Sequence, residues 1–227
     1  MGIFNIFKKK SKKIEPIRPF SVSKVEEGSF EKFFDKLISH SMIILVTGKR
    51  GSGKTSLGIT LLETFNSCKR RCYAMGFSKA KLPRWLKKAD SLEQIPNNSA
   101  VLVDEGAIVY SSRESMKDAN KMLGKLMAIA RHKNLSLILI AQSSAMLDIN
   151  VLRLADILLL KEPSLLQTEF ERRALQKIYE KIKPLFRKKE QRERFFYVWS
   201  DEFQGLLSYE LPKFWNSSIS KAFRNFK

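Results

Sequence analysis

Acidic residues, cysteines and long apolar runs are all scarce in this chain of 227 residues. The spacing of the two cysteines, Cys68 and Cys72, matches neither the usual zinc pattern nor a C-x-x-C redox pair, so we expect ordinary reduced thiols. The longest apolar runs, such as 42–46 and 157–160, fall far short of the roughly 18 residues that a membrane-spanning helix needs. The sequence therefore predicts no membrane-spanning helix.

The shortage of acidic residues leaves a large positive charge. Lys and Arg number 42 against 23 Asp and Glu, which gives a formal charge of +19 and a pI near 10.0. Such an excess favours a polyanionic partner or an anionic membrane surface. The alternative is that the charge only keeps the protein soluble.

The N-terminus joins a short apolar tip, residues 1–7, to a basic run that ends at Lys13. The tip is too short for a signal peptide and lacks a cleavage region, so we expect a cytoplasmic protein. Gly2 suggests myristoylation, but the motif requires Ser or Thr where Ile6 stands. We expect residues 1–24 to form a disordered basic tail. Contact of this tail with nucleic acid or an anionic membrane remains an alternative.

Apolar patterning along the rest of the chain predicts an α/β fold. Continuous apolar runs predict buried strands at 42–46, 100–103, 135–141 and 155–160, with weaker strands at 72–75 and 195–199. Helical spacing predicts helices at 30–38, 54–65, 116–127 and 166–182, the last stopping near Pro184. Strands that alternate with helices indicate a mostly parallel central sheet. We expect one domain over 25–205, with an aromatic tail, 206–227, packing back on it.

A phosphate-binding motif lies between the first predicted strand and the helix that follows it. The segment Gly48-Lys-Arg-Gly-Ser-Gly53-Lys54-Thr55 satisfies G-x-x-x-x-G-K-[ST] in full. In this setting loop N–H groups and the helix N-terminus converge on the β-phosphate, Lys54 reaches the β- and γ-phosphates, and the Thr55 hydroxyl binds Mg²⁺. The sequence therefore predicts a site for ATP and Mg²⁺. The residues expected to bind the nucleotide are Gly48, Lys49, Arg50, Gly51, Ser52, Gly53, Lys54, Thr55 and Ser56.

Two further strands end in polar residues at the edge where ligands bind in open α/β sheets. Strand 100–103 delivers Asp104 and Glu105. We expect Asp104 to hold Mg²⁺ and Glu105 to orient and deprotonate the attacking water, although two adjacent acids can also form a loop or a helix cap. Strand 135–141 ends at Gln142, which is suited to sensing the γ-phosphate; polar residues at strand ends are nevertheless common.

Two stretches are rich in basic residues. Residues 69–88 carry no acidic residue and interleave Tyr73, Phe77 and Trp85 with lysines and arginines, while 187–194 form a second basic block. Aromatic residues among basic ones suit nucleic acid. A solvated face whose aromatics turn to the core explains the first stretch equally well.

Taken together, Gly48 to Thr55, Val101 to Glu105, and the element Ile129-Ala-Arg131-His132 leading into 135–142 resemble the HerA/FtsK superfamily of ring-forming DNA-translocating ATPases. The similarity is closest to genome-packaging ATPases of archaeal viruses, and the segment 211–220 also resembles Zot-like phage assembly ATPases. The resemblance implies a RecA/ASCE-like P-loop NTPase fold, a three-layer sandwich in which the Gln142 strand lies between the strands of the phosphate-binding loop and of Asp104.

The resemblance also implies partners. It implies double-stranded DNA, a homo-oligomeric ring of five or six subunits, and an arginine that reaches the neighbouring subunit's nucleotide. Arg131 is the first candidate for that arginine, with Arg113 and Arg50 as alternatives, because a guanidinium stabilises charge on the transferring phosphoryl group. The competing interpretation of Arg131 is a cation at a helix C-terminus, favourable to the helix dipole.

Four functions fit these patterns. The leading hypothesis is a virus- or plasmid-encoded ATPase that moves double-stranded DNA, as in packaging into a viral capsid. The second is a membrane-surface assembly or secretion ATPase anchored through residues 1–13. A kinase or GTPase is disfavoured because no N-K-x-D guanine signature is present and because Glu105 suits water activation. The fourth is a nucleotide-gated binding module that hardly hydrolyses.

Overall fold

A computed structural model describes residues 15–77, 81–104, 116–141, 149–170, 173–212 and 214–215. The strands of the described chain are β1 (Phe20–Gly28), β2 (Ile43–Thr47), β3 (Cys72–Met75), β4 (Leu86–Lys88), β5 (Ala100–Asp104), β6 (Ser136–Ile140), β7 (Ile157–Leu160), β8 (Phe195–Trp199) and β9 (Phe203–Tyr209). The helices are α1 (Phe30–Ser39), α2 (Lys54–Ser67), α4 (Met116–His132), α5 (Ile149–Leu154), α6 (Leu165–Phe170), α7 (Arg173–Arg187) and the 3-10 turn η2 (Arg192–Arg194). None of the described helices is long and apolar enough to cross a bilayer.

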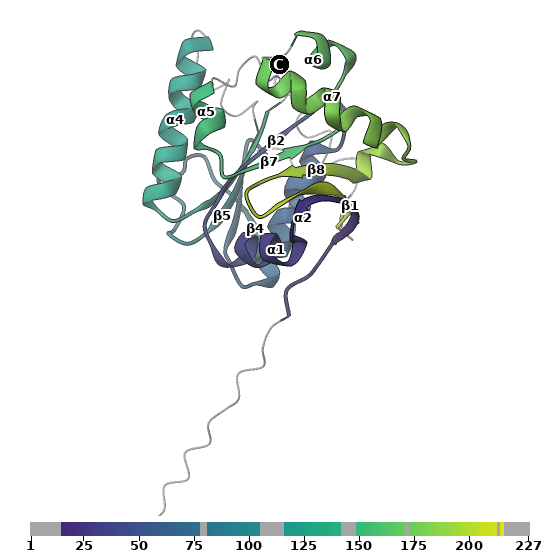
Figure 1. Cartoon of the computed structure of the whole chain (residues 1–227). Helices are drawn as coiled ribbons and strands as arrows, with labels where there is room; N and C mark the ends of the chain where they lie inside the picture. Colours follow the sequence, from purple (N-terminus) through teal and green to yellow (C-terminus); the bar gives the residue numbers. More distant parts are fainter. Residues whose placement is uncertain are drawn as a thin grey trace, which may run out of the picture.

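The described strands form one sheet in the order β1-β9-β8-β7-β2-β6-β5-β3-β4 (Figure 1). The six strands from β7 to β4 are parallel, whereas β8, β9 and β1 add an antiparallel extension at one side. The mostly parallel sheet is thus confirmed. The position of β6 between β2 and β5 is the one that the HerA/FtsK resemblance implies.

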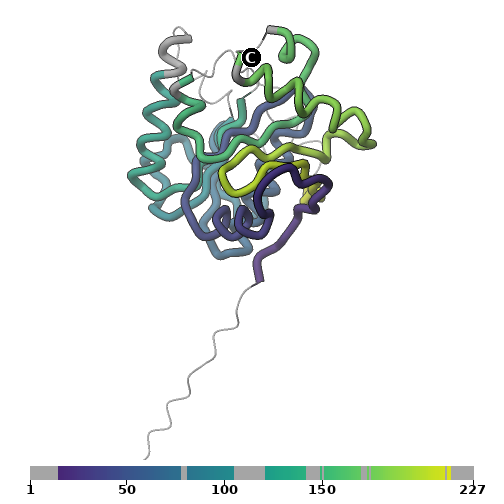
Figure 2. The backbone as a smooth tube through the Cα atoms, in the orientation of Figure 1, coloured from purple at the N-terminus to yellow at the C-terminus, as the bar shows by residue number. Residues whose placement is uncertain are grey.

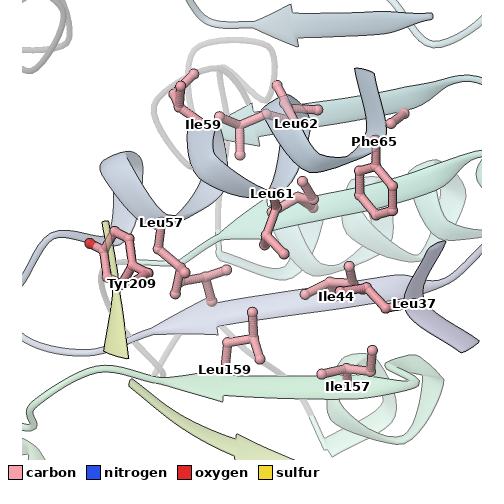
Figure 3. Close-up of a cluster of buried hydrophobic side chains, with 14 of the residues drawn as sticks. Leu37, Ile44, Leu57, Ile59, Leu61, Leu62, Phe65, Ile157, Leu159 and Tyr209 are labelled. Atoms are coloured by element: carbon pink, nitrogen blue, oxygen red, sulfur yellow. The ribbon is translucent and has the colours of Figure 1, made fainter. Parts of the chain in front are cut away.

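Alternate side chains of the central strands feed two different hydrophobic layers. On one face, Ile44 and Val46 of β2 pack with α1 and α2, and the close-up in Figure 3 shows Ile44 and the labelled side chains of α2 meeting over the sheet. On the other face, Ile43 and Leu45 pack with α4, and α7 covers the antiparallel side. Two helical layers around one sheet confirm the three-layer sandwich.

The chain ends contribute two strands that the sequence did not predict. Residues 20–24, expected in the disordered tail, lie in β1, which pairs with β9 along its length (Figure 2). Phe20 anchors β1 because its ring packs 5.5 Å from Phe196 and 6.4 Å from Phe34. The outer residues of β1 are mostly exposed, so the strand lacks the continuous apolar run that marks a buried strand. Similarly, residues 206–209 of the expected C-terminal tail belong to β9, while Leu211, Phe214 and Trp215 do pack on the core.

The predicted helix over 166–182 begins within one residue of the observed start, but its C-terminal end was wrong. The structure has two helices, α6 and α7, and Pro184 lies inside α7. The proline removes one backbone hydrogen bond. Packing outweighs this loss because Leu175, Tyr179, Ile182 and Phe186 of α7 are buried against β7, β8 and β9.

The aromatic residues of the basic stretch 69–88 belong to the core. Tyr73 and Phe77 are buried, and the Trp85 ring packs against Phe214 at 5.7 Å. Arg70 is also structural, because its guanidinium donates to the Ser136 hydroxyl at 2.9 Å and to two backbone carbonyls. These aromatics are therefore no stacking platform for bases, although most of the neighbouring lysines and arginines are exposed.

The Glu26 carboxylate links β1 to β8 by a hydrogen bond and to α7 by an ion pair. Glu26 accepts hydrogen bonds from the Tyr197 hydroxyl at 2.6 Å and from the ammonium groups of Lys181 at 2.7 Å and Lys24 at 2.9 Å. Burial alone raises the pKa of Glu26, but these donors outweigh it and lower the pKa from 4.5 to about 2. Because the folded-state pKa is depressed, the stabilisation is complete above the unfolded-state pKa and is lost as the pH falls toward 2.

We expect the substitution Glu26→Gln to lower the urea midpoint of unfolding near neutral pH, and the difference from the wild type to shrink by about half or more at about pH 3. Urea titrations at both pH values measure this difference. Glu31→Gln is the matched control, since the Glu31 pair with Arg18 is largely exposed and should contribute little at either pH. A pH-independent difference for Glu26→Gln would contradict the assignment.

Candidate nucleotide-binding site

Three neighbouring parallel strands, β2, β6 and β5, end at the same edge of the sheet and bring the phosphate-binding loop and Asp104 to it. In the register of the strands, Val46 of β2 lies beside Ile140 of β6, and Ile140 lies beside Asp104 of β5. Adjacent strands are about 4.8 Å apart, so Asp104 stands about 10 Å across the sheet from the end of β2. The phosphate-binding loop and Asp104 therefore border the same space at the carboxyl edge.

The loop between β2 and α2 depends on glycine at both of its ends. Gly48 and Gly53 have φ angles of +143° and +87°, a region that residues with a side chain rarely adopt. A Cβ atom on Gly48 would also lie 2.6 Å from Lys161 Cβ, and one on Gly53 would lie 2.7 Å from the carbonyl oxygen of Glu193. Glycine is therefore required by conformation and by space.

The interior of the loop presents polar groups that suit phosphate. Lys54 is buried, and its Nζ donates to the carbonyls of Gly48 at 2.8 Å and Lys49 at 3.0 Å, so the ammonium lies over the loop. Among the described residues, Ser52 Oγ is buried without a hydrogen-bond partner. Gly53, the N-cap of α2, supplies no side-chain bond to the first N–H groups of that helix. The first N–H groups of a helix have no acceptor within the helix, so a helix N-terminus suits an anion.

Oxygen donors for a magnesium ion lie on two of these elements. Asp104 is buried at the end of β5, and Thr55 is half-buried in the first turn of α2. A carboxylate and a hydroxyl are ligands that Mg²⁺ accepts. Mg²⁺ usually takes one or two protein ligands, with phosphate oxygens and waters completing its coordination, and these two residues fit that pattern. Glu105, Gln142 and Arg113 lie outside the described residues.

Arg131 lies at the opposite edge of the sheet. Its guanidinium donates to Asp156 Oδ1 at 2.8 Å and to the carbonyl of Leu154 at 3.2 Å. The other oxygen of Asp156 accepts from the backbone N–H of Ile43, the first residue of β2. A five-residue strand, about 15 Å, separates this point from the phosphate-binding loop. The structure therefore does not bring Arg131 to its own chain's loop, whereas Arg50 is exposed on the loop itself.

Two charged residues that the sequence patterns did not single out, Lys161 and Glu162, follow the end of β7. Lys161 is fully buried beside the loop, and the backbone N–H of Lys49 donates to the carbonyl of Glu162 at 3.0 Å. The Glu162 carboxylate pairs with Lys49 at 2.5 Å and with Arg192 at 3.0 Å. The available signal was an apolar strand that ends in charged residues, the same pattern that singled out Asp104.

This arrangement of sheet, glycine loop and helix is the fold of the P-loop nucleoside triphosphatases, and two solved structures share it. The genome packaging NTPase B204 from Sulfolobus turreted icosahedral virus 2, in complex with ATP-γS, is 16% identical, covers 75% of this chain and 97% of its own, and has a TM-score of 0.50. The conjugation coupling protein TcpA of pCW3, with ATP-γS, is 10% identical, covers 94% of this chain and 72% of its own, and has a TM-score of 0.56. They confirm the P-loop nucleoside triphosphatase fold. No protein-family model and no curated protein sequence matches the chain.

We expect the substitution Gly48→Ala to weaken binding of a fluorescent ATP analogue by about tenfold or more and to lower Tm, because the added Cβ meets Lys161 and strains the backbone. Gly124→Ala is the matched control. Gly124 lies in α4, no atom lies within 4 Å of its added Cβ, and alanine favours helix by up to about 1 kcal/mol. Equal affinities for the two variants would show that the Gly48 conformation is not needed for binding.

Proposed function

We propose that this chain is an ATP-hydrolysing motor that translocates double-stranded DNA, with viral genome packaging as its role. The observation that carries the proposal is the geometry at the carboxyl edge, where a complete phosphate-binding loop and Asp104 are separated by one strand, β6. Loop, lysine and acidic strand end are the parts that phosphoryl transfer from a nucleoside triphosphate requires.

In the proposed reaction, the loop N–H groups and Lys54 bind the β- and γ-phosphates of ATP. Thr55 and Asp104 would hold Mg²⁺, which would offset negative charge on the phosphate oxygens. Glu105 orients the attacking water and accepts its proton, and Gln142 senses the γ-phosphate. Proton transfer to a positioned carboxylate contributes about 10²- to 10⁴-fold to a rate.

Two observations support DNA as the polymer that is moved. The formal charge of +19 favours a polyanion, and exposed basic residues cluster beside the edge strand β4: Lys81, Arg84, Lys87 and Lys88. The structures that share the fold also include a genome packaging NTPase and a conjugation coupling protein. Such contacts with phosphates would be independent of base sequence and sensitive to salt.

A motor of this kind needs neighbouring subunits. We propose a homo-oligomeric ring of five or six copies in the host cytoplasm, which engages a viral capsid or a membrane-surface partner. Because Arg131 lies about 15 Å from its own loop, it can act as a finger only toward the nucleotide of a neighbouring copy. Arg113 and Arg50 remain the alternatives.

Removing the proposed water-activating carboxylate separates hydrolysis from binding. We expect Glu105→Gln to lower kcat for phosphate release by about 10²-fold or more and to leave ATP affinity within about threefold. Glu31→Gln, a substitution on the exposed face of α1, is the control and should match the wild type. Equal phosphate release by wild type and Glu105→Gln would remove Glu105 from catalysis and favour a nucleotide-gated binding module.

Steady-state ATPase activity with and without duplex DNA tests the DNA assignment. We expect DNA to stimulate hydrolysis at low salt and the stimulation to fall steeply as salt rises, because phosphate contacts release counterions. Stimulation by anionic vesicles and not by DNA would contradict the motor and support a membrane-surface assembly ATPase, especially if deletion of residues 1–13 abolished it.

A further inference from the structure

Both ends of the phosphate-binding loop pack against residues whose polar atoms meet in one cluster, which the proposed chemistry does not use: Gly53 lies against two of these polar atoms, and Gly48 lies against the backbone and Cβ of Lys161. The cluster consists of the Lys161 ammonium, the Tyr209 hydroxyl and the backbone carbonyl of Glu193, and we call it the rear clamp. Gly48 lies against Lys161, and Gly53 lies against Glu193 and Tyr209. The clamp therefore lies directly behind the first and the last glycine of the loop.

Lys161 joins β7 to the start of β8. Its backbone N–H continues the pairing with Thr47 at 2.8 Å, and its Nζ donates to the carbonyls of Glu193 and Phe195, both at 2.6 Å. Burial lowers the pKa of the ammonium well below its usual range. The two carbonyls and the face of the Tyr209 ring, 4.7 Å away, offset part of the cost of burying the amine. A buried lysine is costly in a core where an apolar residue of the same length would fit.

Tyr209 connects the antiparallel extension to the loop. Its hydroxyl lies 3.0 Å from the carbonyl of Gly53, 2.8 Å from Ser56 Oγ and 3.0 Å from the carbonyl of Glu193. Figure 3 shows the Tyr209 ring beside the start of α2, next to Leu57. Burial raises the pKa of Tyr209, so the hydroxyl keeps its proton and can donate to one of the carbonyls.

We propose that Lys161 and Tyr209 are positioning residues that hold the phosphate-binding loop in its binding conformation from behind. This inference rests on the proposed binding of ATP in that loop. A loop that is open part of the time binds with an affinity reduced by the fraction of time it is competent. The rear clamp raises that fraction in two ways. The Tyr209 hydroxyl bonds to the carbonyl of Gly53, and the bonds of Lys161 Nζ hold the residue whose backbone and Cβ lie against Gly48.

Two conservative substitutions test the clamp. Lys161→Met keeps the length of the side chain and removes the ammonium, and Tyr209→Phe removes only the hydroxyl. Tyr197→Phe is the matched control: it removes a hydroxyl from the neighbouring strand β8 whose partner is Glu26, away from the loop. For each protein we would measure Tm, KM and kcat for ATP, and amide hydrogen exchange of residues 48–53 without nucleotide.

We expect Lys161→Met and Tyr209→Phe to raise KM about three- to tenfold, the factor for losing one or two hydrogen bonds, with kcat changed by less than about threefold. Exchange at residues 48–53 should accelerate in these variants and not in Tyr197→Phe. If both variants lowered Tm as the control does but left KM and loop exchange at wild-type values, Lys161 and Tyr209 would only stabilise the packing of the strands. That result would contradict the inference. Absence of ATP binding by the wild type would overturn the proposed function and the inference together.

Discussion

The parallel pairing of β2 with β6 and of β6 with β5 is the constraint on which the site depends. Parallel strands end at a common edge, so the same pairing that buries Ile44 and Leu45 also fixes where β2 releases the phosphate-binding loop. Asp104 reaches that edge as the last residue of β5 and not through a flexible loop. The distance between loop and carboxylate is therefore set by the hydrophobic core.

The antiparallel extension, formed by β8, β9 and β1, contacts the phosphate-binding loop from behind. Strands β8 and β9 continue the sheet beyond β7, and the turn η2 and Tyr209 extend from them to the back of the loop. Phe20 of β1 and Glu26 hold the outer side of this extension. Residues 20–24 and 206–209, which were expected to lie in tails, thus belong to strands that pack behind the site.

Sequence patterns predicted the parts of the fold that are buried on both faces. The runs that became β2, β5, β6 and β7 are continuously apolar, and only a buried parallel strand explains such short runs beside a glycine loop. The strand β1 was missed because most of its residues are exposed, so that it has no continuous apolar run. A helix end was predicted near Pro184 because proline has a low helix propensity. The packing of Phe186 on the sheet, which extends the helix, depends on residues distant in sequence.

In the candidate site, too, local patterns predicted some residues, whereas others depend on contacts between distant parts of the chain. The motif singled out Gly48 and Lys54, because each role demands one residue type at one spacing, and the apolar strand 100–103 singled out Asp104. The apolar run of β7 could have drawn attention to Lys161, but its role could not be predicted, since its partners are backbone carbonyls that lie more than thirty residues away. Arg131 shows the reverse case, in which a helix-terminal arginine pairs with Asp156 far from the loop of its own chain.

Binding of a nucleoside triphosphate at the loop is the claim that all of these interactions serve. Titration calorimetry with ATP-γS and Mg²⁺, on the wild type, Lys54→Ala and the exposed-surface control Lys69→Ala, measures it directly. The account predicts binding to the wild type and the control, and an affinity about tenfold to a hundredfold weaker for Lys54→Ala, which loses charge-assisted hydrogen bonds to phosphate. The same affinity for Lys54→Ala and the wild type would contradict the account.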